Sequence, residues 1–322
     1  MMLGQNETAE QLAVVKKKYG FDQPLSQQYL YYLNDLSVLS LHAREPGSYT
    51  SYTPQKYGGL ALLSMGDQVL ILKWPYLRDS FQKGGKPVAD VIGETLPNTA
   101  VLAVSAILLA IILGILLGVV SVAYKDQFLD RLIQLVSTIG MSVPSFFSAL
   151  LFAWFFGYVL HDYTHLNMSG SLYAVDDYGQ GTYIEWKNLL LPAVVLGIRP
   201  LAVVSQLMRN SLWDELSKDY IRTARAKGLG QFSIVFRHAL KNALNPVVTA
   251  ISGWFASMLA GAVFVEYIFG WNGLGKEIVD ALNTLDLPII MGAVLVIATL
   301  FIIINIIVDL IYGWLDPRIS YQ

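Results

Sequence analysis

Serine and histidine are the residue types in this sequence that could supply a nucleophile and its base. Ser142 and Ser145 lie in the apolar stretch GMSVPSFF. His161 and His165 follow that stretch, and His238 lies much later in the chain. A hydrolase needs its nucleophile and base within hydrogen-bond reach of each other. We expect the first two histidines at one edge of a membrane and the third at the other, so an intramembrane hydrolase is only a distant alternative.

Metal and nucleotide chemistry lack their usual sequence signatures. The chain has no cysteine, which excludes disulfides, thiol catalysis and cysteine-ligated metals. It contains neither an HExxH motif nor a glycine-rich phosphate-binding loop, so zinc proteolysis and intrinsic ATP hydrolysis are unsupported. The net charge of -2 argues against a nucleic-acid partner. We therefore expect this chain to bind no cofactor or metal of its own.

The composition indicates that lipid is the solvent for most of the chain. Of the 322 residues, 54% are hydrophobic and 14% are charged, whereas soluble domains carry about 25% charged residues. A membrane-spanning helix needs about 20 mostly apolar residues. Five segments satisfy this requirement, which predicts an all-α polytopic membrane protein with visible spans at about 98–124, 132–159, 189–209, 243–268 and 288–314.

Basic residues gather in the loops on one side of these spans. The loop 210–242 is rich in Lys and Arg, whereas the loops after the second and fourth spans contain a single Lys each and no Arg. By the positive-inside rule, we expect the loop 210–242 and the C-terminal tail 316–322 to be cytoplasmic. Residues 1–95 then form an extracytoplasmic segment with short helices and an irregular aromatic-rich insertion, and residues 96–315 form the transmembrane domain.

The start of the chain conflicts with this orientation. An exported segment normally follows a membrane helix or a signal region, but MMLGQNETAEQLAVVKKKYG has no apolar run and contains three consecutive lysines. We therefore expect a sixth, N-terminal span to precede this sequence. The alternative is a true five-span protein with an exported N-terminal tail.

Three residues in the apolar segments are candidates for lining a transport pathway. Arg199 lies near the middle of the third predicted span, where a charge is costly and by default marks a polar cavity. The alternative for Arg199 is a structural ion pair, or a side chain that extends to the membrane surface. Pro144 and Ser145 lie in the second span, where a proline kink could either shape the helix or line a gate.

The loop DYIRTARAKGLGQFSIVFRHALKNAL holds the densest run of Arg and Lys in the sequence. Asp219 is expected to cap a helix over 220–227, which Gly228 ends in a left-handed conformation, with Gly230 as a second flexible point. An amphipathic helix is expected to follow, with Phe232 on its apolar face. Two alternatives are a basic hairpin on anionic lipid and a docking element for another protein.

Small residues favour the docking alternative. Thr223, Ala224 and Ala226 leave room for close approach by another protein, whereas attraction to lipid needs only charge. The segments YIRTARAKGLG and FRHALKNALNP resemble the cytoplasmic loop of permease subunits of bacterial ABC importers, in the peptide/nickel class. Only Ala224, Gly228 and Leu240 match the general pattern of that loop. The sequence Arg222-Thr223-Ala224, however, is similar to the sequence at these positions in permeases of the peptide/nickel branch.

The resemblance extends over nearly the whole chain. It includes an external segment, the start of a helix, the last external loop and the C-terminus, in GFDQPLSQQYLYYL, ADVIGETLPNTAVLAVSA, VEYIFGWNGLGKEIVDALNTLDLPIIMGAVLV and VDLIYGWLDPRISY. It implies the ABC importer permease fold, with six helices, in a bacterial cytoplasmic (inner) membrane. Residues 40–86 are longer and more aromatic than expected for the family, so no function is transferred to them.

The resemblance also implies a function and a set of partners. The chain would form half of a translocation pathway for peptides in an ATP-driven importer and would catalyse no reaction itself; nickel or another small solute is the alternative cargo. The implied partners are a second homologous permease, two cytoplasmic ATPases that bind ATP and Mg²⁺, an extracytoplasmic solute-binding protein and membrane lipid. The residues expected to couple to the ATPases are Tyr220, Arg222, Thr223, Ala224, Arg225, Ala226, Lys227, Gly228, Leu229 and Gly230.

Overall fold

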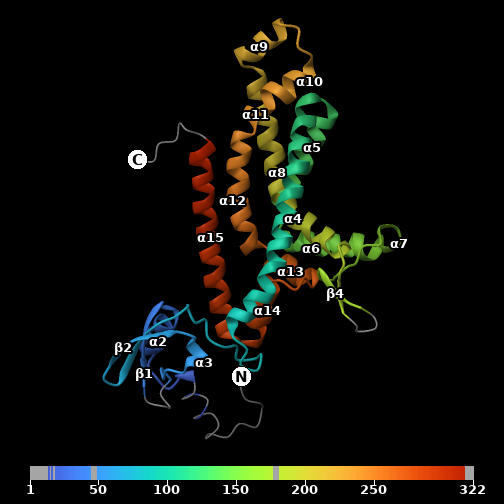
Figure 1. Cartoon of the computed structure of the whole chain (residues 1–322). Coiled ribbons are helices and arrows are strands. Elements are labelled where there is room, and N and C mark those ends of the chain that lie inside the picture. Colours follow the sequence, from blue (N-terminus) through green and yellow to red (C-terminus); the bar gives the residue numbers. More distant parts are fainter. Residues whose placement is uncertain (1–13, 15, 17–18, 45–48, 177–180, 316–322) are drawn as a thin grey trace. The chain divides into compact units, whose positions relative to one another are not determined.

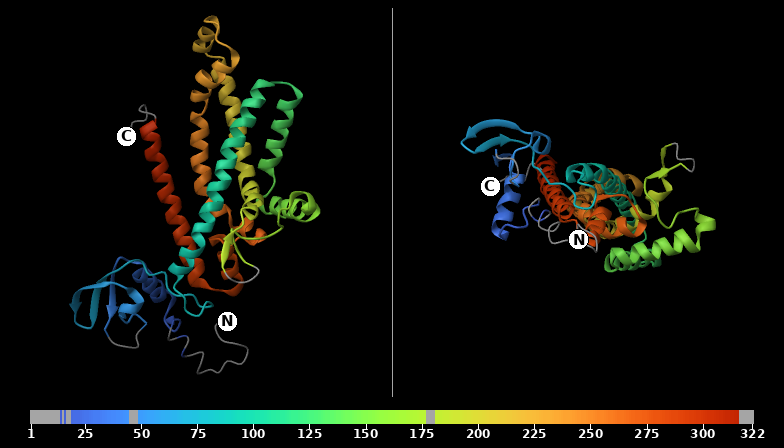
Figure 2. Two further views of the ribbon diagram at one scale, coloured as in Figure 1. Left: turned by 45° about the vertical axis from the view of Figure 1, so that its right-hand side comes forward. Right: turned by 90° about the horizontal axis from the view of Figure 1, so that it is seen from below.

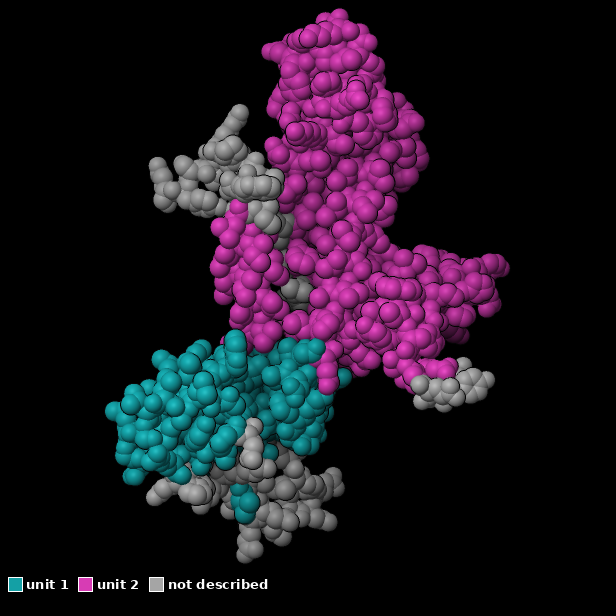
Figure 3. All heavy atoms as spheres, viewed as in Figure 1, with its two compact units in different colours: residues 1–93, 280–294 teal, residues 94–279, 295–322 magenta. Residues whose placement is uncertain are grey.

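The structure of the protein is a computed structural model that describes residues 14, 16, 19–44, 49–176 and 181–315. The chain divides into two compact units, which Figure 3 distinguishes by colour: residues 1–93 with 280–294, and residues 94–279 with 295–322. The predicted tail 316–322 lies outside the described residues.

The first unit contains a helix and a small antiparallel sheet. The sheet has the strand order β1-β3-β2, and Leu70 of the central strand lies opposite Leu41 on one side and Leu63 on the other. Val69 and Ile71 of β3 are buried in the core of the unit. Its elements are α2 (Leu25–Leu36), β1 (Leu39–Ala43), α3 (Pro54–Tyr57), β2 (Leu60–Met65) and β3 (Gln68–Leu72).

These strands were not expected from the sequence, which indicated an irregular insertion over 40–86. A half-buried strand is recognised by alternation of apolar and polar residues. Here the exposed face of the sheet is also apolar, because Leu41, Leu63 and Leu72 all have exposed side chains. In β1 the alternation is reversed from the usual pattern, because Ser40 and His42 are buried while Leu39 and Leu41 are exposed.

The second unit is mostly helical (Figure 1), in agreement with the predicted fold class. Helices α5 and α12 pack against the long helix α8, as the two views in Figure 2 also show. A two-stranded hairpin of β4 and β5 precedes α8. Helices α4, α14 and α15 continue from one unit into the other. The elements from residue 88 onward are α4 (Val88–Ala123), α5 (Phe128–Ser142), α6 (Ser145–Trp154), η1 (Phe155–Val159), α7 (His161–Thr164), β4 (Tyr173–Val175), β5 (Thr182–Ile184), α8 (Lys187–Leu216), α9 (Asp219–Ala226), α10 (Gln231–Ser233), η2 (Ile234–Ala239), α11 (Leu240–Ala243), α12 (Asn245–Gly261), α13 (Val263–Phe269), α14 (Leu274–Thr284) and α15 (Leu287–Leu315).

Several of these helices are long and apolar enough to cross a membrane. Within the described residues α4, α8 and α15 qualify singly, and α5 with the following helical segment makes a fourth if that bent pair is one span. The pair bends by 111°, and Pro144 lies at the break, immediately before α6. Helix α12 has 17 residues, a length of roughly 26 Å. The number and bounds of the five predicted spans therefore stay a prediction.

Close packing between α4 and α8 explains two glycines of the sequence. A Cβ atom on Gly114 would lie 2.7 Å from Cγ1 of Val204, and one on Gly118 would lie 2.6 Å from Cβ of Met208. Both distances are shorter than side-chain contacts tolerate, so glycine is required for the two helices to approach this closely. The pair of glycines four residues apart thus marks a helix–helix interface.

Candidate functional site

Helix α9 and the turn that follows it form the centre of the predicted coupling loop. Gly228 has a φ of +78°, which confirms the predicted left-handed conformation. Its N–H donates to the carbonyl of Arg225 at 2.9 Å, and the N–H of Leu229 donates to the carbonyl of Ala224 at 3.3 Å. These two bonds are the Schellman arrangement, which satisfies carbonyls that a helix end would otherwise leave unpaired. The turn is therefore fixed by local backbone chemistry.

Other details of the loop differ from the sequence prediction. The cap position is Lys218, no side chain caps the helix, and Asp219 instead pairs with Arg222 through an exposed contact of 3.3 Å. Gly230 has φ -68° and ψ 154°, which is ordinary extended backbone and not a second left-handed point. Of the two glycines, Gly228 alone needs glycine for its conformation.

One side of α9 is buried against the rest of the unit. Ile221 is fully buried and Ala224 is 7% exposed. Ala224 therefore faces inward, and the expectation that it leaves room for another protein is wrong. The exposed residues of this helix and its turn include Arg222, Thr223, Arg225, Ala226 and Lys227.

The apolar cluster beneath α9 joins it to the long helices. Its members come from α8, α9, the segment after Gly230 and α12. Burying apolar side chains contributes roughly 25 cal/mol per Å², and close packing limits their independent movement. We therefore expect α9 and the end of α8 to move together. The buried members are Val204, Met208, Leu212, Leu216, Ile221, Ala224, Ile234, Ala239, Ala243 and Val247.

The segment after Gly230 is helical but not a regular α-helix. It contains a π-helical turn, η2, which inserts an extra residue into the helical repeat. As a result, Ile234 and Ala239 are buried, whereas Phe232 and Phe236 are exposed with their ring centroids 4.4 Å apart. The predicted apolar face is thus confirmed only in part: Ala239 is buried in the apolar cluster and Leu240 packs against it, whereas Phe232 is exposed.

A polar cluster fixes the junction between α8 and α9. The carboxylate of Glu215 accepts hydrogen bonds from Nζ of Lys218 at 2.5 Å and from the hydroxyl of Tyr220 at 2.6 Å. The amide of Asn242 donates to that hydroxyl at 3.1 Å, which adds α11 to the cluster. Burial and the bond to Glu215 raise the pKa of Tyr220, so the phenol stays protonated at neutral pH. The base of the coupling loop is therefore tied to two neighbouring helices.

This cluster gives a testable expectation for Tyr220→Phe. Loss of the hydroxyl removes its hydrogen bonds to Glu215, to Asn242 and, at 3.5 Å, to the carbonyl of His238, and one hydrogen bond contributes about 1 kcal/mol on average. If the energy of even one of these bonds limits local opening, amide hydrogen exchange in α9 should accelerate by roughly fivefold or more. The matched control is Lys227→Gln, whose exposed side chain makes no hydrogen bond to another described residue. Equal rates of amide hydrogen exchange in α9 for Tyr220→Phe and Lys227→Gln would show that the polar cluster does not stabilise this helix.

A second polar cluster joins α4, α5 and α8 near the same end of the unit. Asp130 accepts two bonds from the guanidinium of Arg209, at 2.8 Å from Nε and 2.7 Å from Nη2. It also accepts from the hydroxyl of Ser121 and from the backbone N–H of Asp126 at 3.0 Å. The Asp130 side chain is 3% exposed. A buried carboxylate with this many donors is a rigid joint between three helices.

The predicted pathway residues come together only in part. Ser145 and Arg199 line one small cavity of about 70 Å³ with Trp254 and Ser257. The Arg199 side chain is exposed and has no ion pair or hydrogen bond to another described residue. Pro144 does not line this cavity but sets the break between α5 and α6. Arg199 is thus an unpaired cation midway along α8, which continues as one helix through Pro200.

Sequence reasoning missed a buried carboxylate at the opposite end of the unit. Glu266 is fully buried, and its Oε2 accepts from the N–H of Gly275 at 2.7 Å. A Cβ on Gly273 would lie 2.4 Å from the same oxygen, so glycine is required there. The indole of Trp271 donates to the carbonyl of Asn98 at 3.0 Å and ties the loop to α4. The only sequence signal was the spacing of the glycines after Glu266, because the carboxylate acts through contacts that folding creates.

Comparison with known families places these features in context. Residues 92–321 match the family described as "Binding-protein-dependent transport system inner membrane component". A dipeptide transport system permease protein, DppB, of Alkalihalophilus pseudofirmus is 32% identical over 333 residues, covering 99% of this chain and 89% of the relative. A di/tripeptide transport system permease protein, DppB, of Pseudomonas aeruginosa is 31% identical over 341 residues, covering 100% of this chain and 89% of the relative.

A solved structure shares the fold at much lower identity. A chain of the MetNI methionine ABC transporter, in an inward-facing conformation, has a TM-score of 0.56 and 15% sequence identity. The similarity covers 71% of this chain and 97% of the transporter chain. At this identity the likeness concerns the arrangement of helices alone.

Proposed function

Because this chain belongs to the family of binding-protein-dependent transport system inner membrane components, we propose that it forms half of a translocation pathway for peptides and couples that pathway to ATP hydrolysis through α9 and the Gly228 turn. The chain is a multi-pass membrane permease component of an importer. In the proposal a second homologous permease supplies the other half of the pathway, two ATPases contact α9 from the cytoplasm, and an extracytoplasmic protein delivers the solute.

One observation carries the coupling role. α9 presents an exposed basic side, while Ile221 and Ala224 hold its other side on the apolar cluster of α8. A partner that pushes on α9 therefore also moves α8. In the proposed mechanism, ATP and Mg²⁺ are bound by the ATPases, whose closure favours one arrangement of the helices over another by differential contact. The C-terminus and the coupling loop lie on the cytoplasmic side in this scheme, because basic loops are retained there.

The pathway assignment rests on Arg199. An unpaired guanidinium midway along a membrane-spanning helix is costly unless it faces water or an opposite charge. Arg199 has no such partner among the described residues and lies beside Ser145 at a small, mainly apolar cavity. Peptides carry a terminal carboxylate, and the two relatives above are named as dipeptide or di/tripeptide permeases. We therefore place Arg199 and Ser145 on the proposed route, with Pro144 shaping the helix break beside it.

Purification of the full chain from its own membrane tests the proposal. The tagged protein should co-purify with a second permease and with an ATPase. A strain that lacks the chain should lose uptake of labelled dipeptides and recover it when the chain is restored. Uptake of Ni²⁺ serves as the alternative-cargo measurement: its loss, with dipeptide uptake intact, would overturn the peptide assignment. A chain that purifies without any ATPase would contradict the coupling role.

A further inference from the structure

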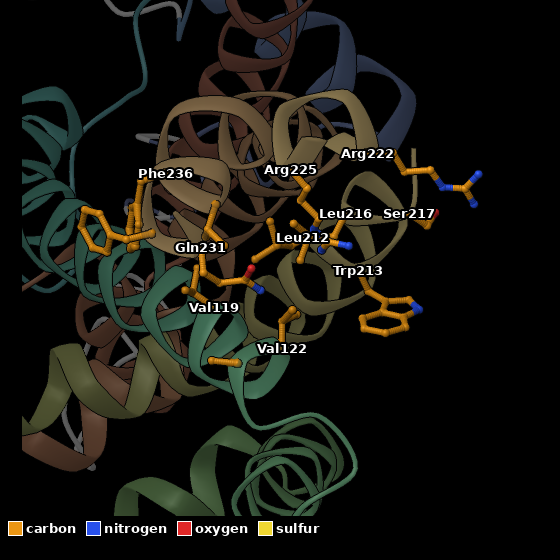
Figure 4. Close-up of a pocket in the computed structure, with 13 residues that line it drawn as sticks. Val119, Val122, Leu212, Trp213, Leu216, Ser217, Arg222, Arg225, Gln231 and Phe236 are labelled. Atoms are coloured by element: carbon orange, nitrogen blue, oxygen red, sulfur yellow. The ribbon is translucent and has the colours of Figure 1, made fainter. Parts of the chain in front are cut away.

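A cavity of about 600 Å³ lies behind α9 (Figure 4). Its walls come from the ends of α4 and α8, from α9, and from the segment α10–η2. Cavities of 300–1,000 Å³ are typical of sites for small organic ligands. The cavity therefore has room for a ligand of that size, beside the coupling residues Arg222 and Arg225 that line it.

The cavity is lined partly by apolar side chains and partly by positively charged ones. Val119 and Val122 of α4 and Leu212 of α8 supply an apolar wall. The charged groups that line it are Arg222 and Arg225, and no acidic residue is among its lining residues. A ligand that satisfies both parts has an apolar body and an anionic head, because an apolar wall excludes a fully hydrated ion.

Arg225 is the cation best placed for such a ligand. Figure 4 shows its side chain extending toward Leu216, whereas the guanidinium of Arg222 points away from the cavity. Arg222 is also engaged with Asp219. By contrast, the side chain of Arg225 makes no ion pair or hydrogen bond to another described residue. Its positive charge is therefore available to an anion inside the cavity.

The surroundings of the cavity have the composition of a membrane interface. Exposed aromatic side chains lie near the end of α8, in the turn after α4 and at the start of α5, and on α10–η2. Tryptophan and other aromatic residues are enriched where spans meet the lipid headgroups. The ammonium group of Lys125 lies over the ring of Trp213, so a positive charge lies close to this aromatic side chain. The exposed aromatic residues are Tyr124, Phe128, Trp213, Phe232 and Phe236.

We propose that this cavity binds one anionic phospholipid, with its phosphate on Arg225 and the upper part of an acyl chain against the wall of Val119, Val122 and Leu212. Lipid is favoured over a protein segment because the apolar wall continues directly into α4 and α8, two helices long enough to span the membrane. The choice of the cytoplasmic leaflet rests on the proposed orientation. A lipid at this position would fill the space between α9 and the helices that α9 moves.

The test is lipid retention by the purified full chain, measured by native mass spectrometry after exchange into equal amounts of phosphatidylglycerol and phosphatidylcholine. The unmodified chain is expected to retain one phosphatidylglycerol preferentially. Arg225→Gln should lower this preference roughly fivefold, the effect of removing one basic residue that attracts an anionic lipid. Val122→Trp, which fills the cavity without changing charge, should lower retention of both lipids.

Arg237→Gln is the matched control, because Arg237 is exposed on the same loop and does not line the cavity. It should leave retention unchanged. The proposal is overturned if Arg225→Gln and Val122→Trp retain lipid like the unmodified chain, or if Arg237→Gln lowers the preference equally. Lipid retention uses the chain alone, so it is independent of the coupling role.

Discussion

Gly228→Val is expected to lower solute uptake by about tenfold or more while leaving the amount of protein in the membrane unchanged. The backbone of Gly228 has a φ of +78°, a conformation that costs a β-branched residue on the order of 1–3 kcal/mol. No atom lies within 4 Å of an added Cβ at this position, so the effect is one of backbone strain and not of a collision. A loss of about 1.4 kcal/mol in the stability of the native turn lowers its population, relative to other conformations of the loop, by a factor of ten.

The strain acts on the element that the ATPase contacts in our proposal. Relief of the strain would break the bonds from Gly228 and Leu229 to the end of α9 and free this helix end from the rest of the loop. ATP hydrolysis by the purified complex should then continue without matching transport. Uptake of labelled dipeptide by membrane vesicles, divided by ATP hydrolysed, measures this ratio directly.

Gly230→Val supplies a matched control two residues away. Gly230 has ordinary extended backbone, and an added Cβ would meet no atom within 4 Å. Its substitution should therefore leave uptake near normal. Gly228→Asn should be intermediate, because asparagine tolerates the left-handed region better than valine. Similar uptake by Gly228→Val and Gly230→Val would count against the turn as a coupling element.

The second large effect is expected for Asp130→Ala. Removing one member of a fully buried ion pair leaves an uncompensated charge and typically costs about 3–5 kcal/mol; the Arg209 side chain is 22% exposed, so we expect a cost toward the lower end of that range. Here Arg209 would lose both bonds to the carboxylate, and Ser121 would lose its acceptor. The joint between α4, α5 and α8 would be weakened next to the coupling loop. Unfolding of the detergent-solubilised chain, followed by intrinsic tryptophan fluorescence, should show the loss of stability.

Two further variants identify the cause of that loss. The double variant Asp130→Leu with Arg209→Met replaces the pair by apolar groups of related size and should recover most of the lost stability. Asp219→Ala removes one member of an exposed pair, since Asp219 is 93% exposed and Arg222 is 75% exposed, and it should change stability little. Equal destabilisation by Asp130→Ala and Asp219→Ala would show that burial of the pair is not the source of its effect.

The helical class and the Gly228 turn followed from local chemistry. A helix that spans the membrane needs about 20 mostly apolar residues, and it forms its backbone hydrogen bonds internally because lipid offers none. The apolar run in α4 is long enough, and its length can be read from the sequence. Gly228 was predictable because a helix end favours glycine in the left-handed conformation, whatever the rest of the fold. Gly114 and Gly118 lie four residues apart on one helix face, a spacing typical of close helix contacts, but only the structure shows that α8 is the partner.

The sequence by itself thus determined the membrane-helix class and the position of the turn in the coupling loop, both through interactions between residues close in the chain. Only the tertiary structure decided which side of α9 is buried, where the π-turn lies, and that Asp130 meets Arg209, 79 positions later. These features depend on contacts between helices. The free energy of such contacts comes from surfaces that folding brings together, and sequence spacing does not record which surfaces those are.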